Sequence, residues 1–278
     1  MHEGLNNFIA KLEQSIPTLP ADQPTWHFII DQQTVPDAQA KVFAIDEPAE
    51  QILLFQRTDF HHLADQGPLW FSAEAGSALQ QLGESLCQQH CAGIALCAAD
   101  RDAAIAHACW LLTVNDGSGG QSLINYYRPD IWAAMALTSS EQLFAPWSAV
   151  YSPAPRALGA RPQHWIGWHA PLDYSPNTVQ KHYSLAASTQ LTQRTLRWVY
   201  WIDRHYTKFN APHGQQLPAI IDNLELLVDH GISEGRWLVR LADLVSRTRL
   251  EEQEPVMAIL RGKADPFIKV DQILAQNL

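Results

Sequence analysis

Residues 122–135 read SLINYYRPDIWAAM and place two tyrosines, an arginine, a proline and an aspartate in consecutive positions. Such a cluster could be a catalytic corner, or it could be the joint at which a strand passes into a helix. A catalytic corner needs a partner acid, base or nucleophile at recognisable spacing, and the sequence shows none. Arg–Asp pairs at the ends of elements are commonly structural, so the composition favours the joint.

The local order of residues supports the same interpretation. Residues 123–127 alternate as in a strand that has two different faces. Pro129 cannot extend a ladder but fits the first turn of a helix, and it pushes Arg128 into extended geometry. Asp130 then lies where its charge meets the positive end of the helix dipole. We therefore predict a strand-to-helix junction with Arg128 and Asp130 able to pair across it.

A second set of side chains with potential chemistry is the cysteines, all within 23 positions and with histidines among them. They are Cys87, Cys91, Cys97 and Cys109, together with His90 and His107. One alternative is a metal-binding regulatory module built from Cys87, His90, Cys91 and His107. However, no CxxC is present, and zinc usually draws on tight paired spacings. We expect reduced core cysteines, no metal and no cofactor.

A hydrolase is the other alternative, because twelve histidines and many serines make a Ser-His-Asp set arithmetically possible. No G-x-S-x-G elbow occurs, and DGSGG (116–120) lacks the required spacing. That segment also lacks the Lys-Ser/Thr of a P-loop, so it predicts a hairpin loop or a flexible tip instead. We expect a protein that is not an enzyme.

The overall composition argues against several classes of binding partner. The 278 residues carry a net charge of −10 with a pI near 5.6, which disfavours binding to nucleic acid or anionic lipid. No apolar run approaches the roughly 18–20 residues that cross a bilayer, so we expect no membrane insertion. The N-terminus shows no signal-peptide pattern, and we expect a cytoplasmic protein.

The periodicity changes along the chain. Strand-like apolar runs alternate with helical spacing in the first half, which predicts an α/β lobe with a central sheet. The expected strands are 26–31, 51–55, 68–73 and 92–99, with a helix at 77–90. From about residue 187 the spacing is helical, with Gly231 as the C′ residue of one helix and Ser233 placed to cap the next, over 234–246. The fold class is thus α+β or α/β, with a helical second lobe.

The segment 138–186 differs from both halves. It contains six prolines and three tryptophans, which predicts extended or looping chain held by aromatic burial, with a candidate strand at 164–170. We therefore expect three parts: an α/β lobe at 1–137, a Pro/Trp-rich connector at 138–186 and a helical lobe at 187–278.

Several of these features resemble one family, the effector adaptors (chaperones) of the bacterial type VI secretion system. The resemblance begins with Asp31, which ends the first strand in FIID, and with Gly67-Pro68 before an apolar strand. Its most specific element is Tyr127-Arg128-Pro129-Asp130, followed by a turn and a tryptophan at Pro146-Trp147. In the family the aspartate usually precedes the proline, whereas here Pro129 precedes Asp130. Ala145 stands at a position where the family commonly has glycine. The turn at 229–237 has His230 in place of the family's tyrosine.

The resemblance implies a two-lobe protein without an active site, which binds a toxic effector encoded nearby and helps to load it onto the VgrG spike. Tryptophan is a frequent anchor at protein interfaces, and the chain has ten. The candidate cargo-binding side chains are Trp165 and Trp168 on the connector, expected to be exposed, and Trp198 and Trp201 on a helical face. Packing between lobes is the alternative for all four.

Overall fold

The computed structural model describes residues 3–115, 120–138, 141–156, 158, 163–170 and 182–276. The chain divides into two compact units. The first comprises residues 3–154 and 163–196, and the second comprises residues 155–162 and 197–278. The boundary falls within one helix, α6 (Ala187–Arg204). Within the described residues, no helix has both the length and the apolar character needed to span a membrane.

The first unit is built on a six-stranded sheet in the order β2-β3-β1-β4-β7-β8, and every neighbouring pair is antiparallel. The class is therefore α+β, as the sequence predicted for a central sheet followed by helices. The strands are β1 (Thr25–Ile30), β2 (Gln51–Leu53), β3 (Leu69–Glu74), β4 (Gly93–Ala98), β7 (Trp147–Pro153) and β8 (Trp165–His169).

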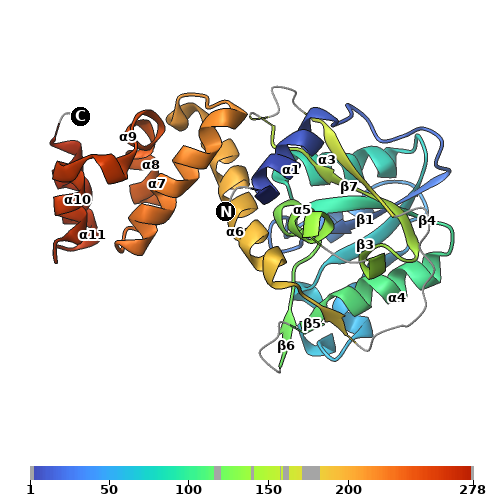
Figure 1. Cartoon of the computed structure of the whole chain (residues 1–278). Helices are drawn as coiled ribbons and strands as arrows, with labels where there is room; N and C mark the ends of the chain where they lie inside the picture. The colour runs from blue at the N-terminus through green and yellow to red at the C-terminus, as the bar shows by residue number, and fades with distance from the viewer. Residues whose placement is uncertain are drawn as a thin grey trace. The chain divides into compact units, whose positions relative to one another are not determined.

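Helices cover both faces of this sheet (Figure 1). Because strand side chains alternate, Trp26, Phe28 and Ile30 of β1 enter one core with α3, while His27 and Ile29 face the side of α4. The helices of this unit are α1 (Glu3–Glu13), α2 (Ala38–Phe43), α3 (Ala78–His90), α4 (Arg101–Leu111), α5 (Pro129–Thr138) and the first part of α6, with 3-10 turns at Leu54–Arg57, His61–Gln66 and Glu141–Leu143.

A small second sheet joins β5 (Thr113–Asn115), β6 (Gln121–Leu123) and β9 (Tyr183–Ser184). β5 and β6 form the antiparallel pair expected on either side of the glycine-rich segment, of which residues 116–119 lie outside the described residues. The strand predicted through Tyr127 ends earlier, at Leu123, so that prediction is wrong for its second half. A turn in which Arg128 N–H donates to Asn125 C=O (3.0 Å) redirects the chain before Pro129 begins α5.

The Pro/Trp-rich segment contributes more regular structure than expected. β7 and β8 belong to the main sheet, with Tyr151 of β7 opposite Ala95 of β4. The predicted strand around residues 164–170 is confirmed as β8. Two strands of the first unit therefore come from the segment expected to be a connector. Residues 171–181 of that segment lie outside the described residues.

The second unit is helical, as predicted. Gly231 has a φ of +91° directly after the C-cap of α7, the left-handed conformation expected of a C′ glycine. The single helix predicted over 234–246 is wrong: Glu234, not Ser233, is the N-cap, and Leu241 (φ −93°, ψ 0°) separates two short helices. The elements are the end of α6, α7 (Leu217–Asp229), α8 (Gly235–Arg240), α9 (Ala242–Arg247), α10 (Glu254–Arg261) and α11 (Pro266–Leu274), with 3-10 turns at Tyr206–Phe209, Gly214–Gln216 and Leu250–Glu252.

Two buried polar side chains connect helices of the second unit through hydrogen bonds to backbone groups. Asn223 donates to the carbonyls of Val245 (2.9 Å) and Thr248 (2.7 Å), and its side-chain oxygen accepts from Leu250 N–H (2.9 Å). Lys269 donates to the carbonyls of His230 (3.1 Å) and Leu260 (2.8 Å), where two helices end. A cation at helix C-termini complements the negative ends of their dipoles.

Candidate functional site

The aspartate that ends the first strand is held by its own turn. Asp31 is buried, and its carboxylate accepts from Gln33 N–H (3.0 Å) and from the Thr34 hydroxyl (2.8 Å). Its backbone N–H donates to Ala92 C=O (2.6 Å), which joins the end of β1 to the start of β4. Asp31 thus stabilises the corner at which the chain leaves the sheet.

The glycine-proline pair meets the same corner from the neighbouring strand. Gln32 donates through Nε2 to Gly67 C=O (2.7 Å), and Leu54 N–H donates to Pro68 C=O (3.0 Å). A Cβ at position 67 would lie 2.5 Å from the ring of Phe55, so a side chain here would displace a buried aromatic. The requirement for glycine is therefore steric.

The Tyr-Arg-Pro-Asp segment completes the corner. Arg128 forms two contacts with Asp130, Nε to Oδ1 at 3.3 Å and Nη2 to Oδ2 at 3.2 Å, and the Asp130 side chain is only 6% exposed. Burial raises the pKa of Tyr127; the nearby Asp31 charge raises it further, while Arg128 lowers it. Asp31 and Tyr127, far apart in sequence, are therefore within electrostatic reach of each other. The Arg128–Asp130 pair predicted from the sequence is confirmed.

Next to the corner lies an aromatic cluster formed by Tyr126, Trp132, Phe144 and Trp147, all buried. The ring of Trp132 lies 5.7 Å from Phe144 and 5.8 Å from Trp147. Two polar atoms in the cluster reach carbonyls of α4: Tyr126 O–H donates to Ala108 (2.9 Å), and Trp147 Nε1–H donates to Ala104 (3.2 Å). The turn before Trp147 contains a cis Ala145–Pro146 bond. The cluster anchors α4 and α5 to the sheet.

His107, one of the candidate metal ligands, packs into this same cluster. Its ring stacks on Trp110 at 5.2 Å and meets Trp147 edge-on at 4.8 Å, and its Nε2 donates to Leu143 C=O (2.9 Å). Burial lowers its pKa from 6.5 to about 4, so the imidazole is neutral near pH 7. His107 is therefore a hydrogen-bonded core residue in this fold.

Three of the four cysteines, Cys87, Cys97 and Cys109, lie in environments that favour the thiol. Burial raises the pKa of Cys87 well above its ordinary value, that of Cys97 to about 12 and that of Cys109 to about 11. Metal binding requires thiolates, so these shifts oppose it. Among the described residues, no three His, Cys, Asp or Glu side chains are grouped as metal ligands would be.

The four candidate cargo-binding tryptophans fall into two classes. Trp165 and Trp168 are buried at 0% and 3% exposure, and Trp168 donates through Nε1 to the Ser152 hydroxyl (2.9 Å), so the expected exposure of these two is wrong. They are buried because β8 belongs to the sheet. Trp198 and Trp201, in the second unit, are half-buried.

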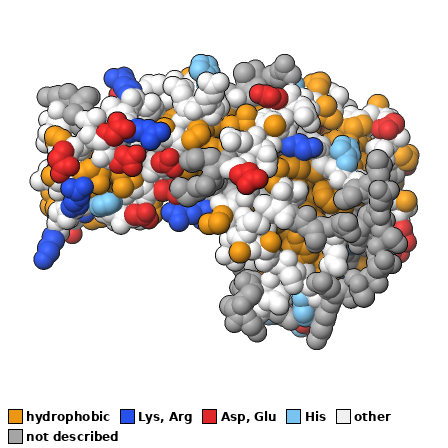
Figure 2. All heavy atoms as spheres, in the orientation of Figure 1, with side chains coloured by type: hydrophobic (Ala, Val, Ile, Leu, Met, Phe, Trp, Pro, Cys, Tyr) orange, Lys and Arg blue, Asp and Glu red, His pale blue; other side chains and the backbone are white. Residues whose placement is uncertain are grey.

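Trp201 is at the centre of a small aromatic group. Its ring meets Trp198 edge-on at 5.5 Å, His205 at 4.9 Å and Phe209 at 5.5 Å. Elsewhere on this unit acidic and basic side chains lie side by side (Figure 2), in ion pairs such as Arg240–Asp271 (2.8 Å) and Arg247–Asp243 (2.7 Å). The accessible part of the Trp198–Trp201 pair is thus an aromatic feature on a surface of mixed charge.

A pocket that sequence reasoning missed lies in the first unit, between α1, α5 and α6. Its lining comes from three segments far apart in the chain, none of which carries a motif. The only trace in the sequence is a run of hydroxyl residues along the first turns of α6, at Ser188, Thr189, Thr192 and Thr195.

Comparison with known proteins gives one family match. Residues 26–145 match the model described as Domain of unknown function (DUF4123). The match covers less than half of the 278 residues, and it contains Asp31, Gly67-Pro68 and the segment Tyr127–Asp130. No curated protein and no solved structure matches the chain. The matched region is the part of the first unit that builds the corner and most of the aromatic cluster.

Proposed function

We propose that this protein is a non-catalytic adaptor that binds a toxic effector of a type VI secretion system and helps to load it onto the VgrG spike. The observation that carries the proposal is the match of residues 26–145, because the DUF4123 family is associated with effector adaptors of that system. The motif residues of the sequence resemblance lie within the same range, apart from Pro146, Trp147 and the turn at 229–237.

The chemistry of the corner is compatible with a binding protein. Arg128 is paired with Asp130, and the Asp31 carboxylate accepts two hydrogen bonds from its own turn; in the adjacent aromatic cluster, Tyr126 donates to a backbone carbonyl. These contacts use the polar groups of the corner to hold its shape. A partner would therefore be recognised by the surface of the protein. Tryptophans often supply binding energy at interfaces, and Trp198 and Trp201 are half-buried and keep some accessible surface.

Co-expression with each neighbouring gene product, followed by purification through a tag on this chain, tests the proposal. We expect one effector to co-purify as a stable complex that remains intact through size-exclusion chromatography, and the VgrG protein to join it. Failure of every neighbouring product to bind would contradict the proposal. So would turnover of generic ester or peptide substrates by the purified protein, if it were lost on substitution of a single serine or histidine.

A further inference from the structure

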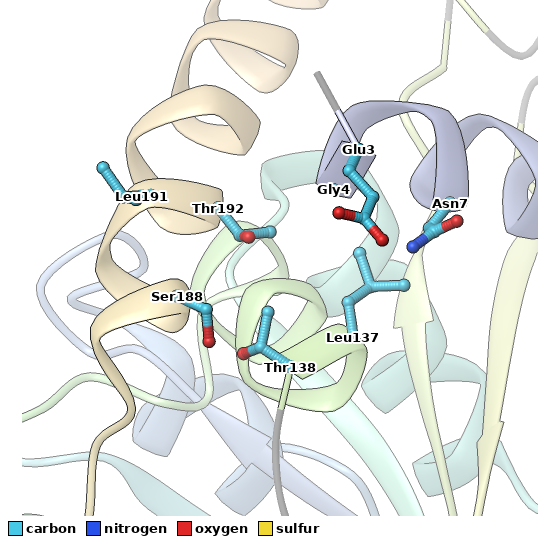
Figure 3. Close-up of a pocket in the computed structure, with 8 residues that line it drawn as sticks. All are labelled: Glu3, Gly4, Asn7, Leu137, Thr138, Ser188, Leu191 and Thr192. Atoms are coloured by element: carbon cyan, nitrogen blue, oxygen red, sulfur yellow. The ribbon is translucent and has the colours of Figure 1, made fainter. Parts of the chain in front are cut away.

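A pocket of about 370 Å³ opens between α1, α5 and α6, entirely within the first unit. Figure 3 shows the Glu3 carboxylate, the amide nitrogen of Asn7 and the side chain of Thr192 directed toward the space beside Leu137, whereas Leu191 projects from the outer side of α6. The lining residues are Glu3, Gly4, Asn7, Leu137, Thr138, Ser188, Leu191 and Thr192.

Two close approaches set the walls of the pocket. A Cβ at Gly4 would lie 2.8 Å from the Thr192 hydroxyl oxygen, so glycine lets α1 and α6 come together there. The hydroxyls of Thr138 and Thr189 are 2.7 Å apart, and Thr138 also donates to Ala134 C=O (2.7 Å). Thr189 is therefore the donor that ties α6 to the end of α5. Small side chains next to these contacts leave the space open.

The lining contains groups that both donate and accept hydrogen bonds, and one carboxylate, that of Glu3. The Glu3 carboxylate forms no ion pair or hydrogen bond with any described residue, and no lysine or arginine lines the pocket. α5 ends at Thr138 and directs the negative end of its dipole here, while α1 begins at Glu3 and α6 begins at Ala187, and each contributes a positive end. Each helix end is equivalent to roughly half a charge, so the three ends together leave about half a positive charge, which the full charge of Glu3 outweighs.

We propose that this pocket binds a basic side chain, arginine or lysine, of a partner protein; as a contact with a secreted effector, the proposal rests on the proposed function. The methylene stem lies against Leu137, and the cationic head donates to the Glu3 carboxylate and to the Thr192 hydroxyl oxygen. The volume is at the small end of the about 300–1,000 Å³ of ligand pockets, which suits one side chain.

Other occupants fit less well. An apolar side chain would cover the Glu3 carboxylate and several hydroxyls without giving them partners, which costs free energy. An acidic side chain would face Glu3 directly. The net charge of −10 over the chain also favours a basic partner segment at long range.

The direct test uses small probes on the full-length protein with ¹³C-labelled leucine and threonine methyl groups. N-acetyl-arginine methylamide and N-acetyl-lysine methylamide are titrated in separate arms, and N-acetyl-citrulline methylamide serves as the neutral probe of similar shape. We expect the basic probes to shift the methyl signals of Leu137 and Thr192, with citrulline binding at least about threefold more weakly, as loss of one accessible ion pair implies. Equal binding of citrulline, or shifts confined to other methyl groups, would overturn the proposal.

Two variants sharpen this test. Glu3→Gln removes the charge and should weaken binding of the basic probes by about threefold. Glu13→Gln, the same change at the exposed end of the same helix and outside the pocket, should leave binding unaltered. Ser188→Trp places a bulky ring at the exposed edge of the pocket and should abolish the shifts. An unchanged affinity in Glu3→Gln, with a wild-type-like spectrum, would overturn the assignment.

The effector complex separates this proposal from the proposed function. If an effector binds the wild-type chain, Glu3→Gln and Ser188→Trp should weaken the complex, while Glu13→Gln should not. Equal binding by the wild-type chain and all three variants would show that the pocket takes no part in recognition, and the adaptor function would still stand. If no effector binds, the adaptor function fails, and the methyl titration still decides whether the pocket takes a basic side chain.

Discussion

Two aromatic groups in this chain contain the same types of side chain but differ in how deeply those side chains are buried. Trp132 and Trp147 lie in the first unit with essentially no exposed surface, and their cluster is tied to α4 by hydrogen bonds to Ala104 and Ala108. Trp198 and Trp201 lie in the second unit and keep part of their rings accessible. Tryptophan content alone therefore does not identify a binding surface, because burial separates a residue that holds the fold from one that can contact a partner.

The largest expected effect is on the buried group. Trp132→Ala removes a side chain packed against Tyr126, Phe144 and Trp147, and should reduce the free energy of unfolding of the first unit by about 3–5 kcal/mol. Trp201→Ala removes a partly accessible ring and should cost clearly less. Urea denaturation, with hydrogen exchange read by mass spectrometry to assign each loss to a unit, measures both. Equal losses would remove the distinction between the two groups.

A polar anchor in the second unit should give the next largest effect. Asn223→Ala leaves the carbonyls of Val245 and Thr248 and the N–H of Leu250 without their partner, and should destabilise this unit by about 2–3 kcal/mol. Asn210→Gly is the control, since the Asn210 side chain is exposed and bonded only to Asp243 in the described contacts, and glycine tolerates the left-handed φ of +59° at this position. Denaturation with the same exchange readout should show protection lost in α7 and α9. Loss confined to the first unit would contradict the assignment.

Buried histidines make the first unit sensitive to acid. Burial lowers the pKa of His27 and of His107 from 6.5 to about 4, so between these values the unfolded chain binds more protons than the folded chain. Stability from both residues is present above pH 6.5 and is lost as the pH falls toward 4. Urea midpoints at pH 7 and pH 5 should differ, and His107→Gln should reduce the difference. A midpoint that rises on acidification would contradict the neutral state of these rings.

The smallest effect distinguishes a buried carboxylate from an exposed one. Arg128→Ala leaves the Asp130 side chain, 6% exposed, without its cation and should cost about 1–2 kcal/mol. Arg247→Ala breaks a pair whose partners are both more than half exposed, and should change stability by less than about 0.5 kcal/mol. Thermal denaturation of the two variants measures the contrast. Equal changes would show that the corner pair acts as an ordinary surface pair.

Sequence reasoning succeeded where the signal is local. Apolar runs predicted β1 and β4, helical spacing predicted α3 and α7, and Pro129 marked the start of α5. Each of these depends on the periodicity or backbone chemistry of a few neighbouring residues. The Arg128–Asp130 pair was predictable for the same reason, since only Pro129 separates its partners in the sequence.

The errors have non-local causes. β7 lies in a proline-rich segment and exists because Tyr151 pairs opposite Ala95 of β4, a contact that no local pattern encodes. The expected exposure of Trp165 and Trp168 was wrong for this reason as well. Tyr126 and Tyr127 alternate like strand residues, yet a turn carries both rings into the interior, 5.6 Å apart. The pocket joins three helices and has no signature in any one of them.

We expect the effector to contact accessible rather than buried aromatic residues. The sharpest test is calorimetric: the co-purifying effector is titrated into the wild-type chain and into a Trp198→Ala/Trp201→Ala variant. We predict a one-to-one complex for the wild type and an affinity at least about 30-fold lower for the variant, as expected for interface hot spots. The variant should retain the hydrogen-exchange protection of the first unit. Absence of wild-type binding, or equal affinity for a well-folded variant, would contradict the assignment of this aromatic pair to effector recognition.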